Sequence, residues 1–240
     1  MLQTRVIPCL QLVNDSLVKT VKFDNYGYIG DPVNTVRIFN ELEVDELCFL
    51  DIRASVQNRE PNIDLLKQIA DECFMPLSYG GGIRSFETAQ KILSIGFEKV
   101  ILNTQAYRQP DLVLKLSEYF GAQAIVASID VKKNLLGKYH AFINDGTEKI
   151  PLNAVEWAQK LVSLGCGELL VTSIDKDGSW AGYDTDILKK ITDAVTVPVI
   201  ANGGAGNIQH IKEVVSRSNV SAVSRRISVW ASSARASRTA

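Results

Sequence analysis

Two glycine-rich turns of this chain could bind phosphate groups. Segments 80–82 and 202–206 each follow a short apolar run and precede a run with helical spacing. Such turns expose backbone N–H groups, and the helix that follows adds a positive potential at its first turn. One glycine turn alone is weak evidence, since glycine also forms ordinary turns. Because Pro76 and Pro198 begin similar segments 122 residues apart, the two turns together favour a substrate with a phosphate at each end.

Asp130 is the best candidate for a catalytic residue. It follows an apolar run, and a carboxyl group among apolar side chains is suited to proton transfer as a general acid or base. The alternative is a helix cap or an ion pair with Lys132. Lys19 could hold a phosphate or a substrate hydroxyl, or be an ordinary surface lysine, and Asp51 could orient neighbouring groups.

Metal and redox chemistry have no matching pattern in the sequence. Neither of the two histidines, His140 and His210, stands at ligand or triad spacing from a cysteine or an acid, so we expect no metal and no cofactor. The cysteines are widely spaced and lack a C-x-x-C pair. This favours reduced, buried thiols at Cys9, Cys48, Cys73 and Cys166.

Eight short apolar segments are predicted as the strands that position these residues. Most are apolar throughout rather than alternating, which is typical of parallel strands covered on both faces. The segments are 5–12, 46–51, 76–79, 99–103, 124–130, 168–175, 198–201 and 220–223. Helices are predicted between most of them, at 31–42, 62–72, 85–95, 109–120, 153–164, 185–192 and 207–216.

This order of strands and helices predicts a single (β/α)8 barrel over residues 1–224. A doubly wound open sheet is disfavoured, because no G-x-G-x-x-G phosphate pattern follows the first strand. An internal repeat supports the barrel, since segments 5–11 and 124–130 are alike, as are 76–82 and 198–204. Two half-barrels are therefore predicted, with positions 11 and 130 at equivalent strand ends that face one central site.

Charged residues begin four of the predicted strands. Arg5, Glu46, Lys99 and Glu168 alternate in sign and sum to zero charge. A ring of this composition would close the bottom of the barrel and could still open by a change of side-chain rotamer. Ordinary solvation of strand ends is the alternative.

Composition argues against several classes of protein. The chain of 240 residues is 46% hydrophobic and 22% charged, which argues against disorder. Its net charge of −1 gives no indication of binding to nucleic acid or to a membrane surface. No apolar run has the length of a membrane span, and the first residues lack the pattern of a signal peptide, so we expect a cytoplasmic protein.

Several motifs, in this order along the chain, give a specific family resemblance. They are R-V-I-P-C-L at 5–10, D-E-L-C-F-L-D-I-R-A-S at 45–55, Y-G-G-G-I at 79–83, N-T at 103–104, S-I-D at 128–130, T-S-I-D-K-D-G at 172–178, G-Y-D at 182–184 and N-G-G-A-G at 202–206. Over residues 1–224 the chain resembles the cyclase subunit of imidazole glycerol phosphate synthase, a barrel of histidine biosynthesis.

The resemblance implies an ammonia-dependent lyase or cyclase without a cofactor. A separate glutaminase subunit would dock on the N-terminal face of the barrel, as a heterodimer, and supply ammonia through the barrel. At the other end, ammonia would react with a bisphosphorylated ribulosyl-formimino aminoimidazole carboxamide ribotide. The products would be imidazole glycerol phosphate and an aminoimidazole carboxamide ribotide.

The resemblance also implies roles for particular residues. Acids at positions 11 and 130 would act as general acid and base. The four charged residues at the strand starts, Arg5, Glu46, Lys99 and Glu168, would gate the entry of ammonia. The substrate and its phosphates would bind at Lys19, Gly82, Asn103, Thr104, Asp177, Gly178, Gly203 and Gly204.

Position 11 departs from the family pattern. Gln11 stands where the first acid is expected, and an amide does not exchange a proton near neutral pH. Loss of one acid–base partner typically slows the reaction by about 10²-fold to 10⁴-fold. Segment 6–23 is more similar to paralogues from surface-polysaccharide gene clusters, for which the expected product is an amidino sugar. A scaffold that only activates the glutaminase is a further alternative, and a sugar-phosphate isomerase is disfavoured by Gln11.

Residues 225–240 form a second departure. They contain four arginines and no acids, where the family continues with a phosphate-binding turn and a last helix. The codons for residues 225–230, read one base over, can spell Ala-Gly-Ser-Val-Phe, so we expect a frameshift near codon 224. A basic interaction tail is the alternative. Both Gln11 and the altered tail are expected to weaken the activity.

Overall fold

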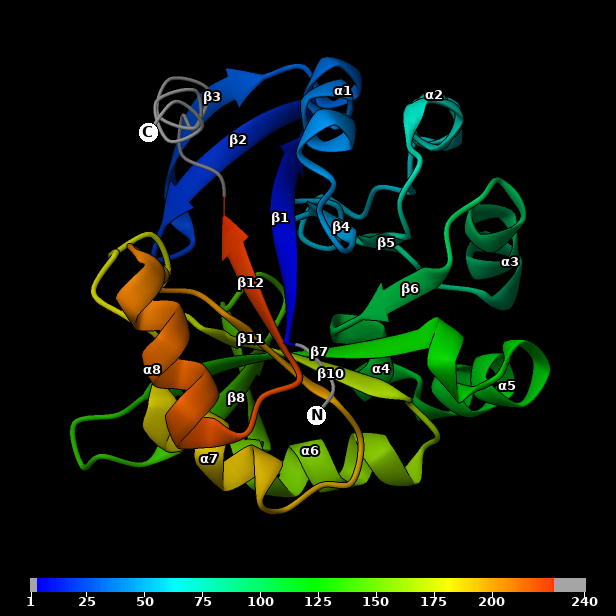
Figure 1. The fold of residues 1–240 in the computed structure, drawn as a ribbon. Coiled ribbons are helices and arrows are strands. Elements are labelled where there is room, and N and C mark those ends of the chain that lie inside the picture. Colours follow the sequence, from blue (N-terminus) through cyan, green and yellow to red (C-terminus); the bar gives the residue numbers. More distant parts are fainter. Residues whose placement is uncertain (1–3, 227–240) are drawn as a thin grey trace, which may run out of the picture.

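The computed structural model describes residues 4–226, which form a barrel of eight parallel strands (Figure 1). In order around the barrel the strands are β1 (Arg5–Val13), β4 (Leu47–Asp51), β5 (Leu77–Gly80), β6 (Lys99–Leu102), β7 (Ile125–Lys133), β10 (Glu168–Ser173), β11 (Val199–Asn202) and β12 (Ala222–Arg226). The sheet closes on itself because β12 pairs with both β11 and β1, in parallel. The predicted (β/α)8 barrel is therefore confirmed.

Helices cover the outside of the barrel. They are α1 (Pro32–Leu42), α2 (Ile63–Glu72), α3 (Phe86–Ser94), α4 (Thr104–Arg108), α5 (Pro110–Phe120), α6 (Ala154–Ser163), α7 (Thr185–Thr192) and α8 (Ile208–Ser218), with a short 3₁₀ helix at Ala122–Ala124. The seven predicted helices are all present, and α4 is an addition to them. Each helix buries an apolar stripe against the strands, as Leu66 and Ile69 do on α2.

Side-chain caps explain where several helices begin. The Asp31 carboxylate accepts a hydrogen bond from Asn34 N at 2.8 Å, and Pro32 occupies the first turn of α1. At α6, Asn153 and Glu156 form a reciprocal capping box. Such caps satisfy backbone N–H groups that have no partner within the helix.

Two antiparallel hairpins extend the barrel at its C-terminal end and are additions to the predicted elements. The first follows β1 and consists of β2 (Ser16–Val21) and β3 (Asp24–Gly30). The second follows β7 and consists of β8 (Tyr139–Ile143) and β9 (Glu148–Asn153). Because each hairpin continues the first strand of one half-barrel, the pair strengthens the internal repeat seen in the sequence.

The apolar core has two parts. The larger part lies between strands and helices, and the smaller fills the barrel interior with side chains such as Ile7, Val126 and Leu170. Cys9 and Cys48, on the neighbouring strands β1 and β4, belong to the interior part. The four cysteines are free thiols, and burial raises the pKa of Cys166 to about 12. Among residues 4–226, no helix is long and apolar enough to cross a membrane.

The last barrel strand runs further than predicted. β12 ends at Arg226, and its final residues, Arg225 and Arg226, lie in register with Pro8 and Cys9 of β1. The first two residues of the predicted aberrant tail thus continue the barrel. The expected frameshift near codon 224 stays a prediction, and most of the predicted tail, residues 227–240, lies outside the described part of the chain.

Candidate active site

A pocket of about 100 Å³ opens where the barrel strands end. Polar side chains from different strands converge on it, and Asp145 and Phe23 reach it from the two hairpins. The polar groups contributed at strand ends include those of Gln11, Asp51, Asn103, Asp130 and Thr172. In barrels of this fold, the C-terminal ends of the strands are where substrates bind.

Asp130 is buried at the wall of this pocket and is held by an amide. Asn103 Nδ2 donates to Asp130 Oδ2 at 3.0 Å and to the Ser128 carbonyl at 3.2 Å. The two N–H groups of Asn103 are therefore engaged in positioning the carboxylate and its strand. This leaves Asn103 Oδ1 as the atom free for other contacts, and it has no hydrogen-bond partner among the described residues.

Gln11, on the opposite side of the pocket, belongs to a buried polar network. Thr20 Oγ1 lies 3.1 Å from Gln11 Oε1 and 3.0 Å from Asp177 Oδ2. Phe23 N donates to the same Asp177 oxygen at 3.3 Å, so the first hairpin is joined to the loop after β10. Thr20 has one hydroxyl proton and can serve only one of its two acceptors at a time. Thr20 lies outside the motifs and the predicted strands, so the sequence offered no signal for it.

The residues expected to bind the substrate separate into two groups. Gly82, Asn103 and Thr104 line the pocket together with Gly81. The second group, Asp177, Gly178, Gly203 and Gly204, is absent from the lining of this pocket. Here the glycines are needed for close packing, because a Cβ on Gly204 would collide with the Gly182 carbonyl.

Lys19 lies on the outward face of the first hairpin. Its side chain is exposed, and its aliphatic part packs against Gly27 on the neighbouring strand β3. Lys19 is therefore not among the residues that line the pocket.

Three loops are joined at the rim of the pocket. Arg53 Nη1 donates to the Tyr26 hydroxyl at 3.2 Å and to Asp145 Oδ2 at 3.3 Å. Burial, and then the negative charge of Asp145, raise the pKa of Tyr26 above its ordinary value. Next to this cluster, Arg59 pairs with Asp51 at 2.9 Å. These contacts hold the two hairpins and the loop after β4 together over the pocket.

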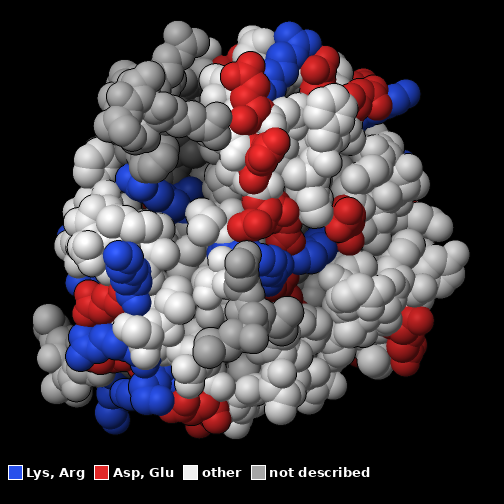
Figure 2. Space-filling view, viewed as in Figure 1, with Lys and Arg blue, Asp and Glu red and all other residues white. Residues whose placement is uncertain are grey.

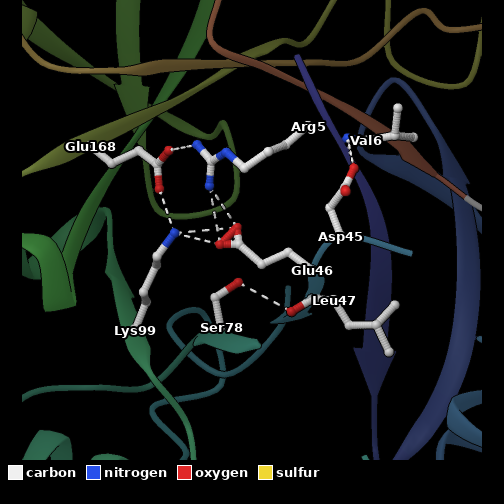
Figure 3. A network of polar contacts seen from close by, with 8 residues as sticks. All are labelled: Arg5, Val6, Asp45, Glu46, Leu47, Ser78, Lys99 and Glu168. Carbon is white, nitrogen blue, oxygen red and sulfur yellow. Dashed lines mark hydrogen bonds and ion pairs between the residues drawn. The ribbon is translucent and has the colours of Figure 1, made fainter. Parts of the chain in front are cut away.

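The opposite end of the barrel is closed by a ring of four charged side chains (Figure 3). Arg5 pairs with Glu46 at 2.9 Å and also with Glu168, while Lys99 pairs with Glu168 at 2.9 Å and also with Glu46. Figure 3 shows the four side chains pointing toward one another, three from the first residues of β1, β6 and β10 and Glu46 from the position just before β4. The glutamate residues are each 4% exposed, so the acids of the ring are buried.

The ring holds its cations in the charged form. Burial alone would lower the pKa of Arg5, but the hydrogen bond and charge of Glu168 raise it on balance. Burial likewise opposes the charge of Lys99, and the nearby Glu168 and Glu46 raise the pKa of Lys99 above its usual 10.5. The ion pairs offset the cost of removing these groups from water.

Metal ligands do not assemble in the described part of the chain. Within residues 4–226, no group of three or more His, Cys, Asp or Glu side chains is placed to hold a metal ion. The side chains that line the pocket are carboxylates, amides and hydroxyls, which can form hydrogen bonds, and a carboxylate such as that of Asp130 is a group that can transfer a proton.

Fold and site together define a (β/α)8-barrel protein with a polar pocket at one end and a closed ring of charge at the other. The chain belongs to the family described as "Histidine biosynthesis protein", whose sequence profile matches residues 5–225.

Individual relatives are similar over most of their length. A protein of Pseudomonas aeruginosa, named "Putative imidazole glycerol phosphate synthase subunit hisF2", is 48% identical over 223 residues, which cover 93% of this chain and 89% of the relative. A protein of Leptospira interrogans, named "Putative imidazole glycerol phosphate synthase subunit HisF", is 45% identical over 93% of this chain and 89% of the relative. A protein of the same name from Leptospira borgpetersenii is 44% identical over 90% of this chain and 85% of the relative.

Proposed function

We propose that this chain is the cyclase subunit of an imidazole glycerol phosphate synthase and uses ammonia from a glutaminase partner. The names of the relatives support this proposal, since each is called a subunit of that synthase. The observation that carries it is the pairing of two features at opposite ends of one barrel. One is the closed ring around Glu46 and Glu168, and the other is the pocket that contains Asp130.

In this proposal ammonia enters at the ring and leaves at the pocket. The ring would open when Arg5 or Lys99 changes rotamer, which breaks two of the four ion pairs. Beyond it, the barrel interior is lined mainly by apolar side chains such as Ile7 and Leu170. Such walls favour a neutral molecule over an ion, because a charge loses its hydration there.

At the pocket, Asp130 would receive the proton that ammonia loses as it attacks the substrate, and would return a proton to a leaving group. Asn103 holds the carboxylate in place for this transfer. Gln11 would contribute a hydrogen bond in place of the second acid. One phosphate would bind at Gly82, Asn103 and Thr104, without a contact to Asn103 Oδ1, because an amide oxygen cannot donate a hydrogen bond. The other phosphate would bind near Gly178, Gly203 and Gly204, beside the pocket.

The reaction would convert the bisphosphorylated ribulosyl-formimino aminoimidazole carboxamide ribotide into imidazole glycerol phosphate and an aminoimidazole carboxamide ribotide. It would be of the lyase or cyclase class, and slower than in enzymes with acids at both positions. The free thiols are in keeping with the cytoplasm as its location.

The glutaminase would dock around the ring as the second subunit of a heterodimer. Exposed apolar side chains lie at helix ends and turns that precede barrel strands, with Leu42 40%, Phe74 89% and Tyr119 65% exposed. Figure 2 shows charged side chains near the centre of one face and a broad, mostly uncharged area on the right, over α3 and α5. An uncharged surface of this kind beside the ring suits a protein partner.

A second candidate function is supported by Gln11. Because an amide stands opposite Asp130, only one of the two equivalent strand-end positions carries an acid, whereas the cyclase reaction uses an acid at both. Delivery of ammonia to form an amidino sugar for surface polysaccharide would use the same ring and partner but a different acceptor. A scaffold that only activates the glutaminase would use the ring and partner without any acceptor.

Labelled nitrogen separates these functions. The purified chain is incubated with the bisphosphorylated substrate and 15N-ammonium, and the products are analysed by mass spectrometry. The proposal predicts one 15N atom in imidazole glycerol phosphate and none in the released ribotide. Unlabelled or absent imidazole product, from folded protein that still binds the bisphosphate, would contradict the cyclase function and favour the second candidate.

A further inference from the structure

The turn between β7 and β8, residues 134–138, presents two leucines to solvent. Leu135 is 107% exposed and Leu136 is 83% exposed. Among residues 4–226 the only other large apolar side chain exposed to this degree is Phe74, at 89%. Figure 1 shows the turn reaching outward from the barrel, beside α7. We call residues 134–138 the leucine tip.

Hydrogen bonds hold the leucine tip in one shape. Asn134 Oδ1 accepts from Leu136 N at 3.0 Å and from Lys138 N at 2.8 Å, and Gly137 N donates to the Asn134 carbonyl at 2.9 Å. Asn134 and Gly137 thus supply the turn chemistry, and the two positions between them are ones that polar residues commonly fill. Since neither leucine is buried against the chain, folding gives no reason for an apolar pair here.

Exposed lysines flank the leucines on both sides. Lys132 and Lys133 precede the tip, and Lys138 is its last residue. Segment 131–139 contains no acid. The net charge of −1 for the whole chain therefore conceals a local excess of positive charge around the leucines.

The base of the hairpin is anchored to the body of the protein. Lys133 and Tyr139 form the last strand pair before the tip. Asp175 accepts a hydrogen bond from Lys133 N at 2.9 Å, Asp184 accepts one from the Tyr139 hydroxyl at 2.7 Å, and Lys190 Nζ of α7 lies 5.6 Å from the centre of the Tyr139 ring. The acids in these contacts are thus at the base, and the tip beyond them is apolar and basic.

We infer that the leucine tip docks the protein on an anionic lipid surface. The two leucines would enter the boundary between headgroups and acyl chains, and the three flanking lysines would contact lipid phosphates and anionic headgroups around them. A protruding apolar tip with cations beside it suits a bilayer, because the leucines need no preformed groove there. Two leucines or three lysines alone bind membranes weakly, so the two contributions act together.

Docking through the tip would also orient the barrel. The hairpin of β7 and β8 extends the barrel at its C-terminal end, where the pocket opens. The pocket end would therefore lie near the bilayer, and the charged ring at the opposite end would stay accessible to a protein partner. This inference does not depend on the reaction that the pocket catalyses.

Vesicle flotation with the full chain tests this docking without any substrate. One set of vesicles contains phosphatidylglycerol and phosphatidylcholine in equal parts, and the other contains phosphatidylcholine alone. We expect the protein to float with the anionic vesicles at low ionic strength, to float less as salt screens the lysines, and to stay behind with the neutral ones.

Variants separate the apolar contribution from the basic one. Leu135→Ser combined with Leu136→Ser should weaken binding at least tenfold, because the apolar area that enters the bilayer is lost. Lys132→Gln and Lys138→Gln should each weaken it about fivefold. Phe74→Ser is the matched control, since it removes an equally exposed apolar side chain from the turn before β5, at the other end of the barrel. It should bind like the wild type, and urea unfolding shows that each variant is folded.

Three results would overturn the inference: no flotation of the wild type with anionic vesicles, equal flotation with neutral vesicles, or undiminished binding of the double leucine variant. A change of oligomeric state in that variant, without vesicle binding by the wild type, would assign the tip to contact between copies of the chain instead. Because no turnover is measured, failure of the cyclase assay leaves the result of this test unaffected.

Discussion

Gln11 on β1 and Asp130 on β7 line one pocket from opposite sides of the barrel, 119 positions apart in the chain. Each is the residue at which its strand begins to pair with a hairpin, Gln11 with Val18 and Asp130 with Phe142. The two half-barrels thus present an amide and a carboxylate at equivalent places. This pairing of one acid with one amide determines which reactions the pocket can support.

Asp130→Asn should abolish turnover of the bisphosphorylated substrate with ammonium. The variant keeps the shape and the hydrogen bond to Asn103 but cannot exchange a proton, so we expect a fall in kcat of about 10² to 10⁴. Affinity for a phosphate-bearing ligand, measured by calorimetry, should stay nearly unchanged. An equal loss of turnover and affinity would show that Asp130 serves binding rather than proton transfer.

Gln11→Asp should raise the same turnover by about tenfold or more, because it restores a second group able to transfer a proton. Initial rates with saturating ammonium measure the change, and Gln11→Asn is the control for the shorter side chain. If Gln11→Asp is folded and no faster than Gln11→Asn, the pocket is not adapted to the cyclase reaction.

Glu46→Gln should destabilise the protein by about 3 kcal/mol, since it removes a buried carboxylate and leaves two partly buried cations with half of their partners. The side chain of Glu46 is 6% exposed and contacts both Arg5 and Lys99. Urea unfolding provides the measurement. The control is Glu213→Gln, whose pair with Arg217 on α8 is exposed, so that its loss should cost less than about 0.5 kcal/mol. Similar effects of the two changes would mean that the ring contributes no special stability.

Lys99 should make the stability depend on pH in the alkaline range. Burial opposes its charge, but Glu168 and Glu46 raise the pKa of Lys99 in the folded protein above its ordinary 10.5. The folded state then binds more protons than the unfolded state above that pH, so stability is complete below about 10.5 and is lost as pH rises through the raised pKa. The difference in free energy of unfolding between wild type and Lys99→Met should shrink over this range. A constant difference would contradict the raised pKa.

The barrel itself could be predicted from the sequence because parallel strands covered on both faces are apolar throughout. The two hairpins could not be predicted in the same way, because apolar runs do not mark their strands. β3 is mostly exposed and has no such run. The turn that joins β1 to β2 was a usable signal, since Asn14 and Asp15 adopt φ values of 48° and 64°, which suit a two-residue hairpin turn.

The same contrast holds for the functional residues. The ring could be anticipated because strand starts meet at one end of any parallel barrel, even where Arg5 and Glu168 are 163 positions apart. The contact of Thr20 on β2 with Asp177 joins the first hairpin to a turn 157 positions further along the chain. The hydrogen bonds from Arg53 to Tyr26 and Asp145 join the loop after β4 to both hairpins. Loop contacts depend on how hairpins fold back over the barrel, which no periodicity in the sequence encodes.

The most direct test of the cyclase function is the rate at which the wild-type chain, without a partner, converts the bisphosphorylated substrate in the presence of an ammonium salt. Ammonium replaces the glutaminase, so the assay isolates this barrel. Cooperative unfolding and binding of the bisphosphate are measured on the same preparation to show that the protein is intact. We predict product that depends on ammonium and disappears in Asp130→Asn. No product from folded protein that binds the bisphosphate would contradict it.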